Sequence, residues 1–82
     1  MIVPSRDFEK QCEKLDPGIL ERVMRKIAEL EANLSVWRHE RLKARPDCKL
    51  RAGDWRVIYQ FDLNKKHIYL LDVGHRSQIY YR

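Results

Sequence analysis

The spacing of apolar residues changes once along this 82-residue chain, from a helical period to a strand period. Over residues 17–34, apolar side chains recur every three or four positions and charged side chains fill the gaps, which predicts an amphipathic helix. Asp16 is its expected N-cap, and Pro17 suits the first helical position, where a missing N–H costs nothing. A shorter helix is predicted after Ser5, a residue type that favours N-caps. Three apolar residues share one face of this helix: Phe8, Cys12 and Leu15.

Beyond residue 48 the pattern is that of β-strands. Residues 55–61 alternate large apolar side chains with others and are rich in aromatic and β-branched types. Turn residues at 52–54 and 62–66 separate the strands, and Gly74 is expected to end one of them. Strands are predicted over 49–51, 55–61, 67–73 and 79–81. The chain is therefore predicted to have an α+β fold, in which two N-terminal helices form a helical hairpin packed on a small antiparallel β-sheet.

The length and the cysteines bound the organisation of the protein. Domains run on the order of 100–150 residues, so one domain spanning 1–82 is expected. The sequence shows neither an apolar run long enough to cross a membrane nor a secretory leader. We therefore expect a cytoplasmic protein that binds no membrane, in which Cys12 and Cys48 are free thiols. The histidines lack ligand spacing, so neither a metal nor an organic cofactor is expected.

Positive charge is concentrated in the second half of the chain. Residues 1–34 hold 6 Lys/Arg and 7 Asp/Glu, whereas residues 35–82 hold 11 Lys/Arg and 5 Asp/Glu. Seven of these cations fall within 35–56, together with Trp37 and Trp55. Basic residues interleaved with aromatic ones fit a surface that neutralises phosphates and stacks bases. For the tryptophans alone, a role as core anchors is the simpler interpretation, while the arginine density favours an anionic partner.

Three short segments follow one another in this second half. They read P-D-C-K-L-R at 46–51, G-D-W-R-V-I-Y at 53–59 and V-G-H-R at 73–76, the last followed by Ile79 and Tyr80. In this order and spacing they resemble the RelE/ParE family of small toxins from bacterial and archaeal toxin–antitoxin systems. The resemblance implies a microbial-ribonuclease-like α+β fold with an N-terminal strand, two helices and an antiparallel sheet. It also implies a cognate antitoxin protein that binds the basic stretch 35–56, so that a hetero-oligomer is expected.

The resemblance further implies a chemistry. RelE-like members cut messenger RNA, usually inside the ribosome, by attack of a 2′-hydroxyl on the adjacent phosphate. The reaction needs a proton acceptor, charge stabilisation at the phosphate and a proton donor for the departing 5′-oxygen. By resemblance, Arg56 and Arg76 take the phosphate-binding and leaving-group positions, where a guanidinium binds two oxygens and stays charged. Tyr80, with Tyr81 as a rival, takes the position that orients or deprotonates the nucleophile, and Lys49 lies on the preceding strand.

Further residues are expected to bind RNA without taking part in the chemistry. They are Arg41, Lys43, Arg45, Arg51 and His75. His75 is also a candidate general base, because imidazole often has this role, although family members frequently carry Lys at this place. Two alternatives to an mRNA-cutting enzyme stay open. A ParE-like member binds and inhibits DNA gyrase without cutting RNA, and a third reading is an inactive or regulatory basic domain.

Overall fold

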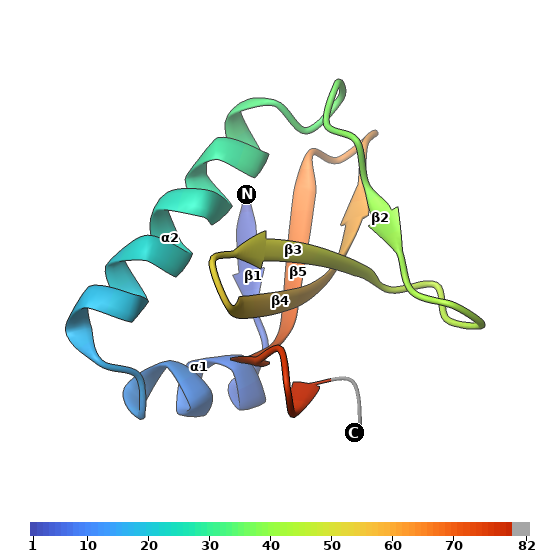
Figure 1. Ribbon diagram of the computed structural model, residues 1–82. Coiled ribbons are helices and arrows are strands. Elements are labelled where there is room, and N and C mark those ends of the chain that lie inside the picture. The colour runs from blue at the N-terminus through green and yellow to red at the C-terminus, as the bar shows by residue number, and fades with distance from the viewer. Residues whose placement is uncertain (80–82) are drawn as a thin grey trace.

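A strand opens the chain and two helices follow it, before four further strands complete one sheet (Figure 1). The computed structural model describes residues 1–79 of the chain. Its elements are β1 (Ile2–Pro4), α1 (Arg6–Glu13), α2 (Pro17–Ala32), β2 (Glu40–Arg41), β3 (Cys48–Ala52), β4 (Trp55–Asp62) and β5 (His67–His75). The strands form a 5-stranded sheet in the order β1-β5-β4-β3-β2. The prediction of an α+β fold is therefore confirmed.

The sheet is mixed, which corrects the prediction of a purely antiparallel one with the helices first. β1 pairs in parallel with β5, while the other neighbouring strands pair antiparallel. The N-terminal strand that the family resemblance implies is present. Apolar spacing did not predict it because three residues are too short to display a period of two, and the strand ends on Pro4, which has no N–H to donate.

The two helices do not form the predicted helical hairpin. α1 packs against β5, whereas α2 packs against β3 (Figure 1). Ser5 caps α1 as expected, because its hydroxyl oxygen accepts a hydrogen bond from the Phe8 amide at 3.0 Å. Asp16 stands at the N-cap of α2, but its side chain makes no capping hydrogen bond there. Neither helix within residues 1–79 is long and apolar enough to cross a lipid bilayer.

Both helices cover the same face of the sheet and enclose the hydrophobic core. The buried helical residues are Phe8, Val23, Ile27 and Leu30, and the buried strand residues that meet them include Leu50, Val57, Tyr59, Ile68, Leu70 and Val73. Trp37 and Trp55 pack against the margin of this core, so the simpler interpretation of the tryptophans is confirmed. Met24 belongs to the apolar pattern of α2 but is 43% exposed.

A register shift between Ile58 and Tyr59 leaves Leu71 of β5 without a partner on β4. Such a bulge increases the local twist, and in Figure 1 the β3–β4 hairpin runs across the direction of β1 and β5. The Ser5 hydroxyl donates a hydrogen bond to the Leu71 carbonyl at 2.8 Å, which ties the start of α1 to the bulge. Beyond the end of β1, the Gln11 side chain continues the pairing by accepting a hydrogen bond from the Val73 amide at 2.8 Å.

Gly74 lies inside β5 and does not end it as predicted. A side chain at this position would begin 3.0 Å from Cδ1 of Ile79, so the missing Cβ makes room for the chain to fold back over the strand. Ile79 is only 3% exposed and lies in a helical turn, not in the predicted last strand. The remainder of that predicted strand, 80–81, falls outside the described residues.

Candidate functional site

The face of the sheet opposite the helices carries the cations of β3. Cys48, Leu50 and Ala52 point into the core, so the two-residue period of the strand turns Lys49 and Arg51 to the other face. The register with β4 places Lys49 opposite Ile58 and Arg51 opposite Arg56. The sequence-predicted residues Lys49, Arg51 and Arg56 are thus brought together on two neighbouring strands.

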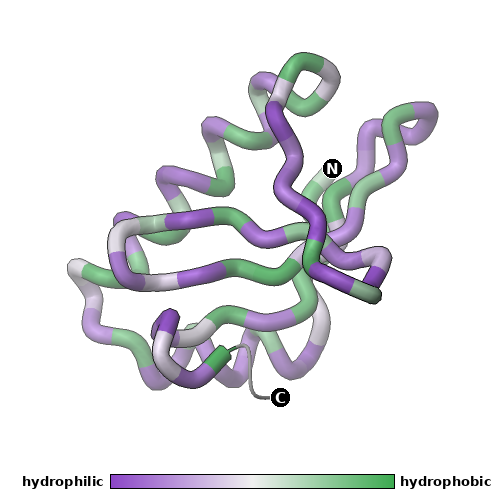
Figure 2. The backbone as a smooth tube through the Cα atoms, turned by 45° about the vertical axis from the view of Figure 1, so that its right-hand side comes forward, coloured by the Kyte–Doolittle hydropathy of each residue, from purple (hydrophilic) through white to green (hydrophobic). Residues whose placement is uncertain are grey.

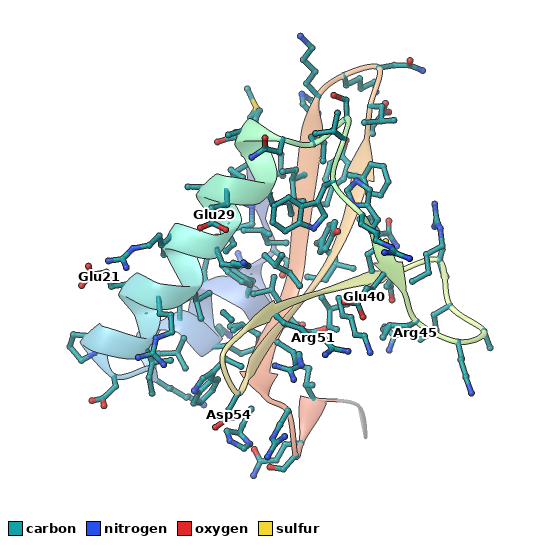
Figure 3. All side chains as sticks on the ribbon, turned by 45° about the horizontal axis from the view of Figure 1, so that its top comes forward. Glu21, Glu29, Glu40, Arg45, Arg51 and Asp54 are labelled. Carbon is teal, nitrogen blue, oxygen red and sulfur yellow. The ribbon has the colours of Figure 1, made fainter. Side chains whose placement is uncertain are left out.

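A single carboxylate oxygen joins the two cations of β3. Oε2 of Glu40 lies 3.3 Å from Nη2 of Arg51 and 3.7 Å from Nζ of Lys49. Glu40 belongs to β2 and is the register partner of Lys49, which explains why it can reach both side chains. Figure 3 shows Glu40 and Arg51 next to each other. Sequence reasoning counted Glu40 only as an opposing charge and missed this bridge, since the pairing of β2 with β3 is not visible in a two-residue strand.

Arg56 is buried, in contrast to the other cations of this face. Its side chain is 9% exposed, and Nη1 donates hydrogen bonds to the carbonyls of Gly53 at 2.7 Å and Trp55 at 2.9 Å. Within residues 1–79 its Nε atom has no hydrogen-bond partner. Gly53 has a φ of 63°, as this tight β3–β4 turn requires. The buried Arg56 guanidinium therefore stabilises the β3–β4 turn through these two hydrogen bonds.

Arg76 and His75 lie at the same end of the sheet, beside the β3–β4 turn. The Arg76 amide donates to the Asp54 carbonyl at 2.8 Å, and its side-chain Nε lies 3.6 Å from Oδ1 of Asp54. Both side chains are exposed, so Arg76 can exchange this carboxylate for another anion. Nδ1 of His75 accepts the Ser77 amide at 3.2 Å, which assigns the proton of the neutral ring to Nε2. As arranged here, Nδ1 of His75 is engaged by Ser77, and Nε2 of the ring offers a hydrogen-bond donor.

The connection between β2 and β3 forms a second basic feature. Four cations and one leucine line a hollow of about 480 Å³: Arg41, Leu42, Lys43, Arg45 and Lys49. Figure 2 shows β2 and the connection that follows it as a predominantly hydrophilic part of the tube. Asp47 anchors the connection, since its buried carboxylate pairs with Arg45 and accepts a hydrogen bond from Gln60 of β4 at 2.6 Å. Of the predicted RNA-binding residues in 41–45, Arg45 is thus linked through Asp47 to β4.

A larger hollow of about 870 Å³ also has Lys49 in its lining. Its lining residues are Lys26, Asn33, Val36, Trp37, Arg38, Glu40, Lys49, Leu50 and Arg51. Lys26 lies over the Trp37 ring, with Nζ 5.7 Å from the ring centroid. Sequence reasoning did not find Lys26 as a site residue, because it occupies the polar face of a helix remote in sequence. Lys49 lines both hollows and connects them.

The segment that carries Glu40 is fixed to the sheet by His39. Nε2 of His39 lies 3.0 Å from the Leu34 carbonyl, which can only accept, so in the neutral ring Nε2 carries the proton and Nδ1 accepts the hydrogen bond of the Tyr59 hydroxyl at 2.6 Å. The His39 ring also stacks on Phe61 with 3.9 Å between centroids. Burial, reinforced by Cys48 and Glu40, raises the pKa of Tyr59 well above its ordinary value, so the hydroxyl stays a donor.

This arrangement suits the binding of an extended anion. The cations run from the β2–β3 connection, past Lys49 and Arg51 on the outer face of β3, to Arg76 by the β3–β4 turn, and this row is called the cationic margin below. Tyr80, the predicted catalytic tyrosine, lies outside the described residues, so the structure does not place it. Within residues 1–79, no group of three His, Cys, Asp or Glu side chains is placed to hold a metal ion.

Comparisons with known proteins agree with this architecture. A family model described as the ParE toxin of the type II toxin–antitoxin system parDE matches residues 2–80. No curated protein sequence matches the chain significantly. A chain of the toxin–antitoxin complex RelBE2 from Mycobacterium tuberculosis has 24% identity and a TM-score of 0.76, covering 93% of this chain and 96% of that chain.

Two further solved structures have the same fold. The isolated RelE toxin of E. coli has 21% identity and a TM-score of 0.75, covering 99% of this chain and 90% of that chain. A chain of the RelB–RelE antitoxin–toxin complex from Methanococcus jannaschii has 20% identity and a TM-score of 0.73, covering 95% of this chain and 94% of that chain. At these identities the likeness concerns the fold alone.

Proposed function

The chain belongs to the RelE/ParE family of toxins from type II toxin–antitoxin systems, and on that premise we propose that it is an endoribonuclease that cuts messenger RNA on the ribosome. The observation that carries the proposal is the continuity of the cationic margin, in which Lys49 lines both basic hollows and Arg51 follows it on the same strand face. Successive phosphates of a single strand need such a track of cations.

The proposed reaction is attack of a 2′-hydroxyl on the adjacent phosphate, with loss of the 5′-oxygen. Arg76 stabilises the charge that develops on the phosphate, since its guanidinium is 62% exposed and leaves a weak surface ion pair to do so. Lys49 and Arg51 hold the neighbouring phosphate. Tyr80 remains the candidate for orienting or deprotonating the nucleophile, and the reaction needs no metal.

Arg56 takes a different role in this proposal from the one its motif implies. A side chain that is 9% exposed and bonded to two carbonyls of its own turn offers little surface to a phosphate. We therefore propose that Arg56 acts as a positioning residue, which holds the β3–β4 turn so that Asp54 and Arg76 face the substrate. His75 binds RNA through its Nε2 proton.

We propose that a cognate antitoxin controls the protein in the cytoplasm. Solved structures of this fold include toxin–antitoxin complexes, RelBE2 and RelB–RelE among them. The basic stretch 35–56 suits an acidic, partly disordered segment of such a partner. Charge reversal at Arg41, Lys43 and Arg45 together is expected to weaken a complex with the co-purified antitoxin, and unchanged binding by calorimetry would count against this surface.

A second candidate function is inhibition of DNA gyrase. The observations that favour it are the ParE description of the matching family model and the burial of Arg56. The two functions separate in paired assays on the purified protein. Primer extension on a translated mRNA is expected to show new cuts, and a gyrase supercoiling assay is expected to show no inhibition. Inhibition of supercoiling without cuts would replace the nuclease proposal with the gyrase one.

A further inference from the structure

One carboxylate sits where the proposed function requires a phosphate. Oε2 of Glu40 approaches both Nη2 of Arg51, at 3.3 Å, and Nζ of Lys49, at 3.7 Å. Two cationic groups around one oxygen form the arrangement that binds an oxyanion in general. The oxygen of Glu40 therefore marks a preformed oxyanion subsite within the chain itself.

We propose that Glu40 is a built-in competitor, whose carboxylate fills this subsite and must leave before a phosphate binds between Lys49 and Arg51. The inference rests on the proposed RNA-cutting function for the identity of the phosphate. Its consequence is that Glu40 sets the affinity of the protein for single-stranded RNA and limits binding to chains that offer further contacts along the margin.

The local geometry allows the carboxylate to leave without disturbing the fold. The side chain of Glu40 is 46% exposed, so it can rotate into water. Its backbone stays in place, because the preceding residue, His39, is bonded to Tyr59 and stacked on Phe61. Arg51 is 57% exposed and Lys49 24% exposed, so both can be reached by a ligand from solvent.

Glu21 provides a matched control for the loss of one negative charge. It forms an exposed ion pair with Arg25 on α2, with 2.8 Å between Oε1 and Nη2. Figure 3 shows Glu21 on the outer side of α2, away from Glu40 and Arg51. Glu40→Gln and Glu21→Gln change the net charge equally, so any difference between them reports on the subsite and not on charge alone.

The test compares binding of a cleavage-resistant 2′-O-methyl RNA hexanucleotide, by fluorescence anisotropy, and of pyrophosphate, by calorimetry, at low salt. Glu40→Gln is expected to bind both probes about threefold to tenfold more tightly than the wild type, whereas Glu21→Gln changes affinity by less than about twofold. In an Arg51→Gln background the gain from Glu40→Gln is expected to shrink, because one of the two unmasked cations is missing.

The outcomes separate this inference from the proposed function. RNA binding by the wild type with equal effects of Glu40→Gln and Glu21→Gln overturns the competitor role and leaves the nuclease proposal intact. A gain for pyrophosphate alone, with no RNA binding by any variant, supports the competitor role and contradicts the nuclease proposal. No binding of either probe by any variant overturns both.

Discussion

The hydroxyl of Tyr59 and Nδ1 of His39 are 2.6 Å apart, in a contact that joins the centre of the core to the segment bearing Glu40. Tyr59 is fully buried on β4, and His39 lies just before β2. The basic connection between α2 and β3 is long and contains only a two-residue strand, so this hydrogen bond is one of its main attachments to the sheet. The positions of the cations in the site depend on it.

Tyr59→Phe is expected to lower the free energy of unfolding by about 1–2 kcal/mol, because it leaves Nδ1 of His39 without its donor while keeping the ring in the core. Tyr69→Phe is the control, since the Tyr69 hydroxyl lies 3.3 Å from the His67 ring at a partly buried position and should matter less. Urea unfolding of both variants measures the difference. Equal losses of unfolding free energy would show that the hydrogen bond between Tyr59 and His39 contributes no more to stability than the contact between Tyr69 and His67.

Stability is expected to fall as the pH rises above about 9, the ordinary pKa of a thiol. Burial raises the pKa of the Cys48 and Cys12 thiols and of the Tyr59 hydroxyl. Groups with a raised pKa keep their protons in the folded state after the unfolded chain has lost them, so their contribution is complete below the unfolded pKa and is lost above it. Urea midpoints at pH 7, 9, 10 and 11 should decrease, and between pH 10 and 11 they should decrease less steeply in Tyr59→Phe. A flat profile would contradict this.

A third prediction concerns Asp47, which attaches the connection between β2 and β3 to the sheet. Asp47→Ala removes the partner of Arg45 and of Gln60, and should cost about 1–2 kcal/mol because Asp47 is buried. Glu21→Ala, which removes an exposed ion pair, should cost less than about 0.5 kcal/mol. Amide hydrogen exchange should also speed up over 42–45 in Asp47→Ala. Unchanged exchange there would show that the loop is held by other contacts.

Two glycines should respond to substitution with opposite signs. Gly53 has a φ of 63°, so Gly53→Val should destabilise the β3–β4 turn by about 1–2 kcal/mol. Gly18 lies in the first turn of α2 with open space around it, so Gly18→Ala should stabilise the protein by about 0.5–1 kcal/mol. Thermal melts of the two variants show whether each substitution raises or lowers the stability. If Gly53→Val raised it, the turn would not require the conformational freedom of glycine at this position.

The spacing of apolar residues predicted those helices and strands that are long enough to display a regular period. α2 and β4 were found because their apolar residues repeat over several turns or pleats, and the Ser5 cap because its chemistry is local. β1 and β2 were not found from spacing, since strands of three and two residues have no readable period and form through their neighbours.

The sequence indicated which cations belong to the candidate site, but not how deeply each is buried or which residues contact it. Residues of the G-D-W-R and V-G-H-R segments do lie together at one end of the sheet, as Arg56 and Arg76 show. Whether an arginine is exposed or buried depends on the tertiary packing around it, and no local pattern separates the buried Arg56 from the exposed Arg76. The contacts of Glu40 with β3 depend on strand register, which no local pattern carries.

The measurement that tests the nuclease account most directly is primer extension on a translated mRNA with wild-type protein, Arg76→Ala and Arg25→Ala. Arg76→Ala should cut about 10²–10³-fold more slowly, because it removes a cation that stabilises charge on the phosphate. Arg25→Ala removes an exposed arginine from α2 and should cut at the wild-type rate. Equal rates for all three proteins, or no cuts by the wild type, would contradict the account.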